Sequence, residues 1–256
     1  MKGLLSNQKV LVSGAGGLLG AKVSKHIIEQ GAQVIAADVN LAHMRDKLIA
    51  ENIAIESDKV ELVKLDVTKE IDVKAFFSEI SGISGAVNCT YPRNKTYGAH
   101  FLDVSLGSFN ENLSLHLGSA FLFTQQCAAY FKKHQVPFSL VNISSVYGVI
   151  APKFAIYDNT PMTMPVEYAA IKSAILHLNK YVTTYINDSR FRVNCVSPGG
   201  IFDHQPKKFL EAYKANTNGE GMLDVEDVVG AILFLLSEQS KFVTGQNLIV
   251  DDGFTQ

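Results

Sequence analysis

The sequence predicts an α/β fold in which a parallel sheet is covered by helices on both faces. Short runs rich in β-branched residues alternate with longer helical segments along the whole chain. Most of these runs are apolar throughout, as expected for strands buried on both faces. With 256 residues, of which 47% are hydrophobic, the chain can build one such domain. We therefore expect a single doubly wound, seven-stranded domain spanning residues 1–256.

The elements follow one another as strand–helix units. The expected strands are residues 9–12, 33–37, 60–65, 86–88, 138–144, 191–197 and 247–250. The expected helices lie near residues 18–30, 40–50, 70–80, 108–134, 167–187 and 224–236. Sheets built this way bind their ligands at the carboxyl ends of the strands.

Two connections are longer than the regular alternation requires. Residues 146–166 and 198–222 both follow strands, where α/β sheets place substrate loops or lids. Residues 91–98 follow the fourth strand and add further polar and aromatic side chains. We expect these three segments to form the rim of a substrate site.

Charge and composition favour a small-molecule ligand. A net charge of -2 gives no electrostatic reason to expect nucleic acid or an anionic membrane as partner. The three cysteines are widely spaced and lack a CxxC pattern, so neither a disulfide framework nor a metal site is expected. The N-terminal apolar run is too short for a signal peptide, and no window resembles a membrane span. These features predict a cytoplasmic protein.

A glycine-rich turn, SGAGGLLG, directly follows the first expected strand and opens the first helix. In this context the glycines let a dinucleotide's pyrophosphate approach the helix N-terminus. The pattern GxxGxxG is complete, whereas a second pattern would need glycine where Leu18 stands. The predicted pyrophosphate contacts are Gly14, Gly17, Leu18, Leu19 and Gly20. A glycine turn needed only for packing fits the same letters.

Two aspartates at strand ends extend the predicted cofactor site. Asp38 ends the second strand, 18 residues after Gly20, where a carboxylate can accept hydrogen bonds from ribose hydroxyls. It would repel a 2′-phosphate, and no arginine follows at once, so NAD is favoured over NADP. Asp66 and Val67 end the third strand and are candidates for the adenine side. Both aspartates could instead cap the helices that follow them.

The segment EYAAIK places Tyr168 and Lys172 four residues apart, on one face of an expected helix. A phenol titrates near pH 10, and an adjacent ammonium would lower that pKa by stabilising the phenolate. Ser145 follows the fifth strand in NISSVYG, where its hydroxyl can orient a substrate oxygen toward the tyrosine. A half-buried tyrosine, a solvated lysine and a serine that caps its own turn are the alternative interpretations.

Together, in this order, these segments resemble the short-chain dehydrogenase/reductase family over nearly the whole chain. The resemblance rests on the glycine turn, Asp38, LDVT, Asn88, the serine pair at 144–145, YAAIK, RVNCVSPGG and GQNLIVDDG. It implies a Rossmann-type domain that binds NAD(P)(H). In it, Tyr168 is the general acid/base, Lys172 lowers the pKa of Tyr168 and holds the nicotinamide ribose, and Ser145 polarises the reacting oxygen. Asn88, Pro198, Gly199 and Ile201 then lie beside the cofactor.

The resemblance also implies a homodimer or homotetramer, with the helices at 108–134 and 167–187 as the expected interface. Three departures limit what can be transferred. The usual Asn-Asn-Ala-Gly after the fourth strand is here Asn88-Cys89-Thr90-Tyr91. His116 aligns with an asparagine of a proton relay, and it serves either as a relay group or as a core residue. Ser145 and Tyr168 are 23 residues apart, about twice the separation usual in compact members.

A narrower resemblance concerns the substrate. The segments YPRNKTYG, SSVYGVIAPKFAIY and TPMTMPVEYAAIK are similar to dehydrogenases of bacterial flagellin-modification and surface-sugar (legionaminic-type) pathways. This implies a sugar-like substrate, with Arg93, Asn94, Tyr147 and Tyr157 as candidate contacts. The expected activity is NAD-dependent interconversion of a secondary alcohol and a ketone. An epimerase or dehydratase with tightly bound NAD and a non-catalytic NAD-sensing protein are the alternatives.

Overall fold

Seven parallel strands form the centre of the molecule in the computed structural model, which describes residues 3–256. They are β1 (Lys9–Ser13), β2 (Gln33–Asp38), β3 (Val60–Lys64), β4 (Gly85–Asn88), β5 (Phe138–Ile143), β6 (Phe191–Pro198) and β7 (Asn247–Val250). The sheet order is β3-β2-β1-β4-β5-β6-β7. The order reverses between β1 and β4, so a crevice opens at the carboxyl ends of these two strands. The predicted fold class is therefore confirmed.

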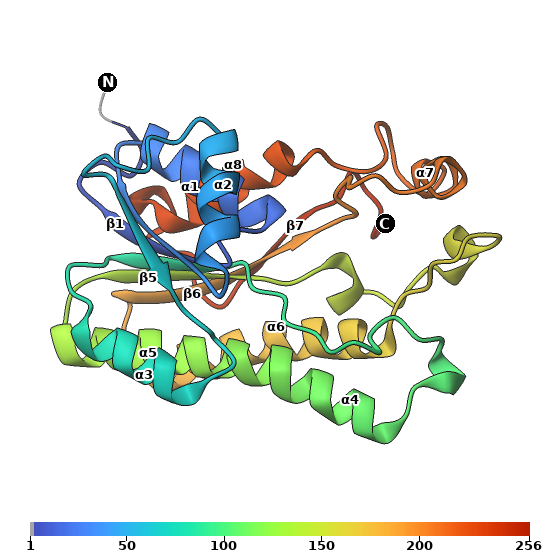
Figure 1. Cartoon of the computed structure of the whole chain (residues 1–256), viewed down its shortest axis with the longest axis horizontal. Helices are drawn as coiled ribbons and strands as arrows, with labels where there is room; N and C mark the ends of the chain where they lie inside the picture. Colours follow the sequence, from blue (N-terminus) through green and yellow to red (C-terminus); the bar gives the residue numbers. More distant parts are fainter. Residues whose placement is uncertain (1–2) are drawn as a thin grey trace.

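One face of the sheet is covered by α1 (Leu18–Glu29), α2 (Leu41–Ala50) and α8 (Val225–Leu236) (Figure 1). Apolar residues of these helices pack against the valines and alanines of the central strands. Each helix begins at an identifiable residue. Asn40 caps α2, and Asp224 caps α8 within a reciprocal capping box. Polar caps thus start α2 and α8, and the apolar faces of all three helices hold this layer on the sheet.

The opposite face carries α3 (Glu70–Glu79), α5 (Ser119–His134) and α6 (Val166–Ile186) (Figure 1). Phenylalanine side chains of α3, α5 and the strands fill the core beneath them. The helix expected over 108–134 is confirmed, with a local change in its hydrogen-bond register. It begins earlier, as α4 (Leu106–Asn112), then widens into a π-helical segment at Leu113–Gly118 before α5. His116 lies in that segment, which shifts the direction of its side chain.

The two long connections pack against each other and against the C-terminal segment. The 198–222 connection contains a helix that the sequence did not predict, α7 (Lys207–Lys214). The Tyr213 ring on α7 stacks on Phe254, with ring centres 4.5 Å apart. From the 146–166 connection, Lys153 donates to the backbone carbonyl of Phe254 at 2.7 Å. A small separate core thus supports the rim.

Within the described part of the chain, none of the helices has both the length and the apolar character needed to cross a membrane. All three cysteines have free thiols; Cys127 and Cys195 are buried, and Cys89 is partly buried.

Candidate active site

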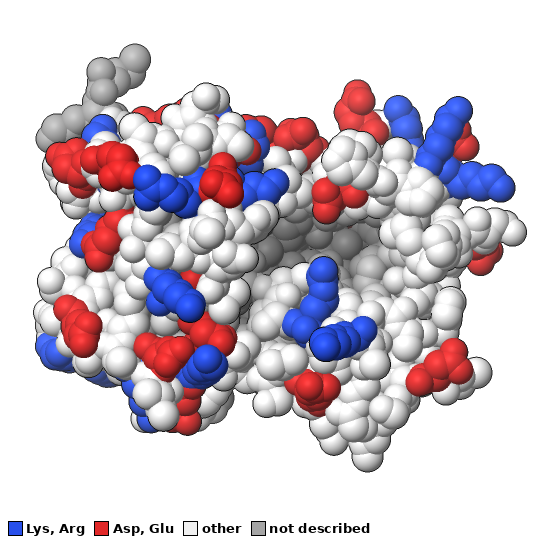
Figure 2. Space-filling view, in the orientation of Figure 1, with Lys and Arg blue, Asp and Glu red and all other residues white. Residues whose placement is uncertain are grey.

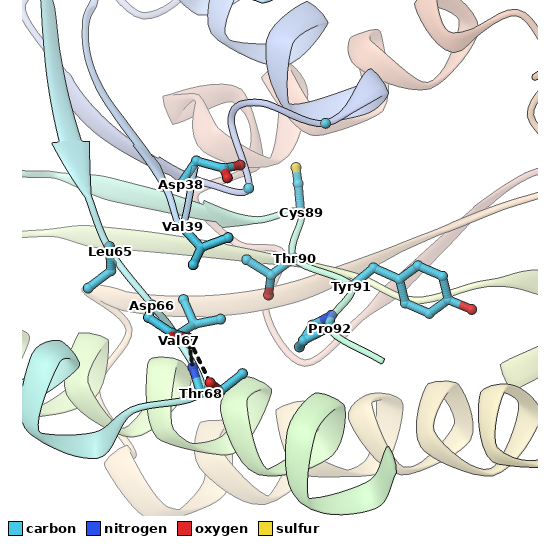
Figure 3. A pocket seen from close by; sticks show the side chains of 12 residues that line it. Asp38, Val39, Leu65, Asp66, Val67, Thr68, Cys89, Thr90, Tyr91 and Pro92 are labelled. Atoms are coloured by element: carbon cyan, nitrogen blue, oxygen red, sulfur yellow. Dashed lines mark hydrogen bonds between the residues drawn. The ribbon is translucent and has the colours of Figure 1, made fainter. Parts of the chain in front are cut away.

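A cavity of about 310 Å³ lies at the carboxyl ends of β1, β2, β3 and β4 (Figure 3). Its wall includes five residues predicted for the adenosine side and the glycine turn. These are Gly14, Gly17, Asp38, Asp66 and Val67. Figure 3 shows Asp38 and Val39 on one side, Asp66 and Thr68 on the other, and Cys89 to Pro92 along the segment after β4. The predicted cofactor residues are thus brought together in space.

The glycine turn leaves the N-terminus of α1 open. Gly14 adopts a φ of +79°, in the left-handed region that favours glycine. Helix α1 begins after Gly17 with neither a side-chain cap nor an acidic residue in its first turn. Its first backbone N–H groups therefore point outward with the positive end of the helix dipole. These are the features of an anion site at a helix N-terminus.

Gly20 serves the packing of this turn. A Cβ atom at this position would lie 2.1 Å from the carbonyl oxygen of Gly14. Only glycine lets α1 approach the turn this closely. Gly20 and Leu19 do not line the cavity, whereas Leu18 lines the neighbouring one described below.

Asp38 is held at the end of β2 by two backbone donors. One carboxylate oxygen accepts from the Gly16 N–H and the other from the Asn40 N–H, both at 3.0 Å. The carboxylate therefore ties the glycine turn to the second strand and faces the cavity. The alternative interpretation, Asp38 as the cap of α2, does not hold, because Asn40 is the cap residue.

Asp66 occupies the opposite wall, in a local turn with Thr68 (Figure 3). Its oxygen accepts from the Thr68 hydroxyl at 2.6 Å and from the Thr68 N–H at 3.1 Å. Burial raises the pKa of this carboxyl, but the Thr68 hydrogen bonds and nearby Lys69 outweigh it and hold the pKa below its usual value. Asp66 is thus an ionised acceptor beside the cavity at neutral pH.

A second cavity, of about 430 Å³, continues from the first toward the substrate rim. The surface is hollowed between the part that carries α7 and the part that carries α4 (Figure 2). Predicted catalytic, cofactor and substrate residues meet on its wall. They are Leu18, Ser145, Tyr147, Tyr157, Tyr168, Lys172, Pro198, Gly199 and Ile201. The YxxxK spacing on α6 and the ends of β5 and β6 bring these groups to one place.

Tyr168 and Ser145 face this cavity together, but the electrostatics differ from the expectation. Burial raises the pKa of the Tyr168 phenol above its usual value, and hydrogen bonding with Ser145 opposes that rise. The Lys172 ammonium lies 5.5 Å from the centre of the Tyr168 ring. In the protein alone, the group that lowers this pKa is therefore Ser145, not Lys172 as the sequence suggested.

Lys172 is 5% exposed and has strong local partners. Its ammonium donates to the Ile143 carbonyl at 2.8 Å and lies 3.4 Å from Nε2 of His116. Burial lowers the pKa of Lys172 to about 8. Burial and the charge of Lys172 lower the pKa of His116 to about 2, so its imidazole is neutral. Nε2 of His116 is then the acceptor that faces Lys172.

His116 contacts Lys172 but does not line either cavity. It is 2% exposed, and its Nδ1 has no hydrogen-bond partner in the structure. Asn88 is also set behind the wall, where its carbonyl oxygen accepts from the Thr90 hydroxyl at 2.7 Å. From these positions, His116 can orient Lys172, and Asn88 can orient Thr90, which lines both cavities.

Two predicted substrate contacts lie away from the cavity wall. Arg93 is exposed, and its guanidinium lies 5.0 Å from the centre of the Tyr91 ring. The Asn94 side chain bonds to Ser108, Glu111 and Asn112. Asn94 therefore fixes the 91–98 segment onto α4 and has its amide group engaged within the chain.

Several wall residues were not predicted. They include Cys89, Thr90, Met162, Thr163, Met164, Asp203, Gln205, Phe209, Tyr213 and Met222. Most of them lie in the three rim segments, which the sequence identified only as segments. The methionines of TPMTMP were the available signal, since clustered methionines suit adaptable apolar binding surfaces. Among residues 3–256, no group of three or more His, Cys, Asp or Glu side chains is placed to hold a metal ion.

Comparison with known proteins agrees with this geometry. A family model described as Enoyl-(Acyl carrier protein) reductase, from the short-chain dehydrogenase/reductase family, matches residues 14–255. Post-translational flagellin modification protein A of Campylobacter coli is 38% identical, with 98% of this chain and 99% of that protein covered. The 7alpha-hydroxysteroid dehydrogenase of Bacteroides fragilis is 26% identical over 97% of this chain and 95% of its own length.

Solved structures show the same architecture. A short-chain dehydrogenase from Leptospira borgpetersenii with bound NAD+ superposes with a TM-score of 0.85 at 29% identity, covering 98% of this chain and 94% of that one. A short-chain dehydrogenase/reductase from Burkholderia xenovorans gives a TM-score of 0.83 at 27% identity, covering 99% and 98%. With the serine, tyrosine and lysine on one cavity wall beside an open helix N-terminus, this chain belongs to the short-chain dehydrogenase/reductase family.

Proposed function

We propose that the protein uses NAD to interconvert a secondary alcohol and a ketone on a sugar, sugar phosphate or nucleotide sugar. The observation that carries this proposal is the shared wall of the second cavity, where Ser145, Tyr168 and Lys172 lie together. The relative from Campylobacter coli, named for flagellin modification, favours a surface-glycan or flagellin-modification pathway. Its 38% identity is measured over 98% of this chain.

The residues present fit a dinucleotide. The open N-terminus of α1 suits a pyrophosphate, and Gly14 and Gly17 leave the backbone accessible there. Asp38 and Asp66 offer carboxylate acceptors on the adenosine side. Because Asp38 would repel a 2′-phosphate, the site favours NAD over NADP. Pro198, Gly199 and Ile201 form the wall proposed for the nicotinamide side.

Each catalytic side chain has one proposed task. NAD, when bound, accepts a hydride from the alcohol carbon or, as NADH, returns one to the ketone carbon. Tyr168 accepts the hydroxyl proton as its phenolate during oxidation and, as the phenol, donates it during reduction. Ser145 donates a hydrogen bond to the reacting oxygen and keeps it near the phenol. Lys172 places a positive charge beside Tyr168 and offers N–H donors toward the cofactor ribose.

The cavity wall suits a ring that carries hydroxyl groups. Tyr147 and Tyr157 line it, with their hydroxyls 3.3 Å apart, and can stack on or hydrogen-bond to a sugar. Among the described residues that line this wall, Lys172 is the single Lys or Arg, and its proposed partners are Tyr168 and the cofactor. A phosphate or carboxylate group of the substrate therefore needs another cationic partner, at the rim. Arg93 is the proposed partner: it lies off the wall, but its exposed guanidinium lies against the ring of Tyr91, which lines the cavity.

A substrate screen tests the proposal. Purified protein is mixed with NAD+ and a panel of hexoses, hexose phosphates and nucleotide sugars, and NADH formation is followed. We expect turnover with at least one member, weaker turnover with NADP+, and turnover lowered by orders of magnitude with the Tyr168→Phe variant. Turnover of steroid or cyclic diol substrates with no sugar accepted would refute the sugar assignment while leaving the dehydrogenase intact.

One observation favours a second candidate. The 23-residue separation between Ser145 and Tyr168 is similar to that of relatives that epimerise or dehydrate sugars through a keto intermediate. Such an enzyme would return the hydride to the same substrate and keep the cofactor bound. Net NADH accumulation during turnover separates the two functions. Product formation with no added NAD+ and no NADH would establish the second.

A further inference from the structure

Tyr91 stands at the junction of the two cavities and lines both. Its ring is edge-on to Tyr168, with centres 5.6 Å apart, and to His116, with centres 5.0 Å apart. Its hydroxyl pairs with that of Tyr97. In Figure 3 the ring extends away from Asp38 and the adenosine wall. Tyr91 replaces the glycine of the usual Asn-Asn-Ala-Gly segment, so this arrangement depends on a residue that the resemblance did not assign.

The Lys172 ammonium faces the Tyr91 ring, 5.6 Å from its centre. This distance lies within the range in which a cation is attracted to an aromatic ring. Within residues 3–256, no carboxylate lies at ion-pair distance from Lys172. The buried charge is therefore balanced by a carbonyl, a neutral imidazole and two phenol rings. A buried ammonium with so few partners depends on each of them.

We propose that Tyr91 is a positioning residue whose ring holds Lys172 in its charged form beside Tyr168. This inference rests on the proposed function in one respect: the task proposed for Lys172 requires its amine to carry a positive charge. The hydroxyl of Tyr91 is directed to Tyr97 and is not needed for this role. The ring alone is needed, so phenylalanine should replace Tyr91 and an aliphatic residue should not.

The other titratable groups around Lys172 do not supply a countercharge at neutral pH. His116, from the π-helical segment, is neutral. Cys89, just after β4, and Cys195, within β6, are near enough to Lys172 to interact with its charge, and burial raises the pKa of both thiols to about 12. Tyr168, on the same helix, is protonated, because burial raises its pKa. The Tyr91 ring is therefore a contribution that a single substitution can remove without introducing a charge and without altering Tyr168 itself.

The first test needs no substrate. Lys172 lines the cavity, so acetic anhydride can reach its free amine, and mass spectrometry follows the extent of Lys172 acetylation against pH. We expect a midpoint near the lowered Lys172 pKa of about 8 in the wild type and in Tyr91→Phe. In Tyr91→Leu the midpoint should fall by about half a pH unit or more, because the ammonium loses an aromatic partner. An unchanged or raised midpoint in Tyr91→Leu overturns the proposal.

A variant of unchanged shape covers the case in which Tyr91→Leu does not fold. Pentafluorophenylalanine at position 91 keeps the ring but withdraws electron density from its face. Compared with Tyr91→Phe, it should lower the acetylation midpoint of Lys172. Equal midpoints for the two rings would show that Tyr91 acts only by filling space.

Kinetics with an active substrate gives the second readout. In Tyr91→Leu, the loss of kcat/KM at alkaline pH should begin at a lower pH than in Tyr91→Phe. A uniform drop of kcat/KM at every pH would indicate a structural role and contradict the proposal. Failure of every substrate to react would refute the proposed function, but it would leave the acetylation result standing.

Discussion

The Tyr168 hydroxyl is the only group on the cavity wall to which the proposed mechanism gives the proton. Tyr168→Phe removes this oxygen and retains the ring that packs against Tyr91. We expect kcat to fall by about 10²- to 10⁴-fold, the usual contribution of a positioned acid or base. Tyr181→Phe is the matched control, because Tyr181 lies on the same helix and is 62% exposed. Unchanged NAD+ affinity in both variants, measured by calorimetry, would show that the fall in kcat comes from the proton-transfer step and not from weaker cofactor binding. Equal turnover of the two variants would contradict the assignment.

The charge on Lys172 gives the activity an alkaline limit. Burial lowers the pKa of Lys172 to about 8, so the free enzyme loses this charge as the pH rises through that value. We expect kcat/KM to decline above about pH 8. The pH profile of Lys172→Arg provides the comparison, because a guanidinium stays protonated. In an active Lys172→Arg variant, the decline of kcat/KM should occur at a higher pH than in the wild type. A decline at the same pH would show that a group other than Lys172 causes it.

Asp38 determines the preference between the two cofactors. Asp38→Asn keeps the size of the side chain and one of the two oxygens that accept from the Gly16 and Asn40 N–H groups, but it removes the charge that would face a 2′-phosphate. We expect the ratio of kcat/KM for NADP+ to that for NAD+ to rise about tenfold or more. Asp66→Asn is the control, since it removes a charge on the opposite wall. If Asp38→Asn leaves the ratio unchanged, NAD selectivity must arise elsewhere.

The sequence identified those site residues whose positions follow from local periodicity. Tyr168 and Lys172 share a helix face, and Ser145 follows a strand, so their meeting required only the parallel topology. Met162, Met222 and Tyr213 could not be assigned, because tertiary packing of the rim brings them to the wall. The pairing of Asn94 with α4 was missed for the same reason.

Helix α1 packs tightly against the glycine turn in its first turn. Gly20→Ala would place a Cβ atom 2.1 Å from the Gly14 carbonyl oxygen. We expect a loss of about 1–3 kcal/mol in the free energy of unfolding, together with weaker NAD+ binding, because the turn must open. Gly230→Ala is the control, because its Cβ would meet nothing within 4 Å. This exposed helical position should gain about 0.5–1 kcal/mol. Urea unfolding measures both, and equal effects would contradict this account.

The strands and most helices could be predicted because their composition and period are local properties. The π-helical segment at Leu113–Gly118 could not, since a slip in hydrogen-bond register has no distinct composition. Its consequence is functional, because it carries His116 beneath Lys172. Helix α7 was also missed. It is short and polar, and its position depends on contacts of Phe209 and Tyr213 with the rim.

The molecule as a whole presents an apolar groove on the face opposite α1 and α8. It runs between α5 and α6 and has a volume of about 450 Å³. Phe121, Tyr181 and Tyr185 project beside it, and the last is 73% exposed. Figure 1 shows α5 and α6 along one outer layer of the molecule. These are the two helices that the family resemblance predicts as a subunit interface.

We predict a dimer or tetramer that associates through this groove. Light scattering after gel filtration should give two or four times the chain mass of 27.9 kDa. Phe121→Glu with Tyr185→Glu should yield a monomer, because two charges would be buried in an apolar contact. Ile71→Glu, at an exposed apolar residue on α3, should leave the mass unchanged. Since α6 also carries Tyr168 and Lys172, loss of the contact should lower kcat along with the mass. A wild-type monomer with full activity would refute both statements.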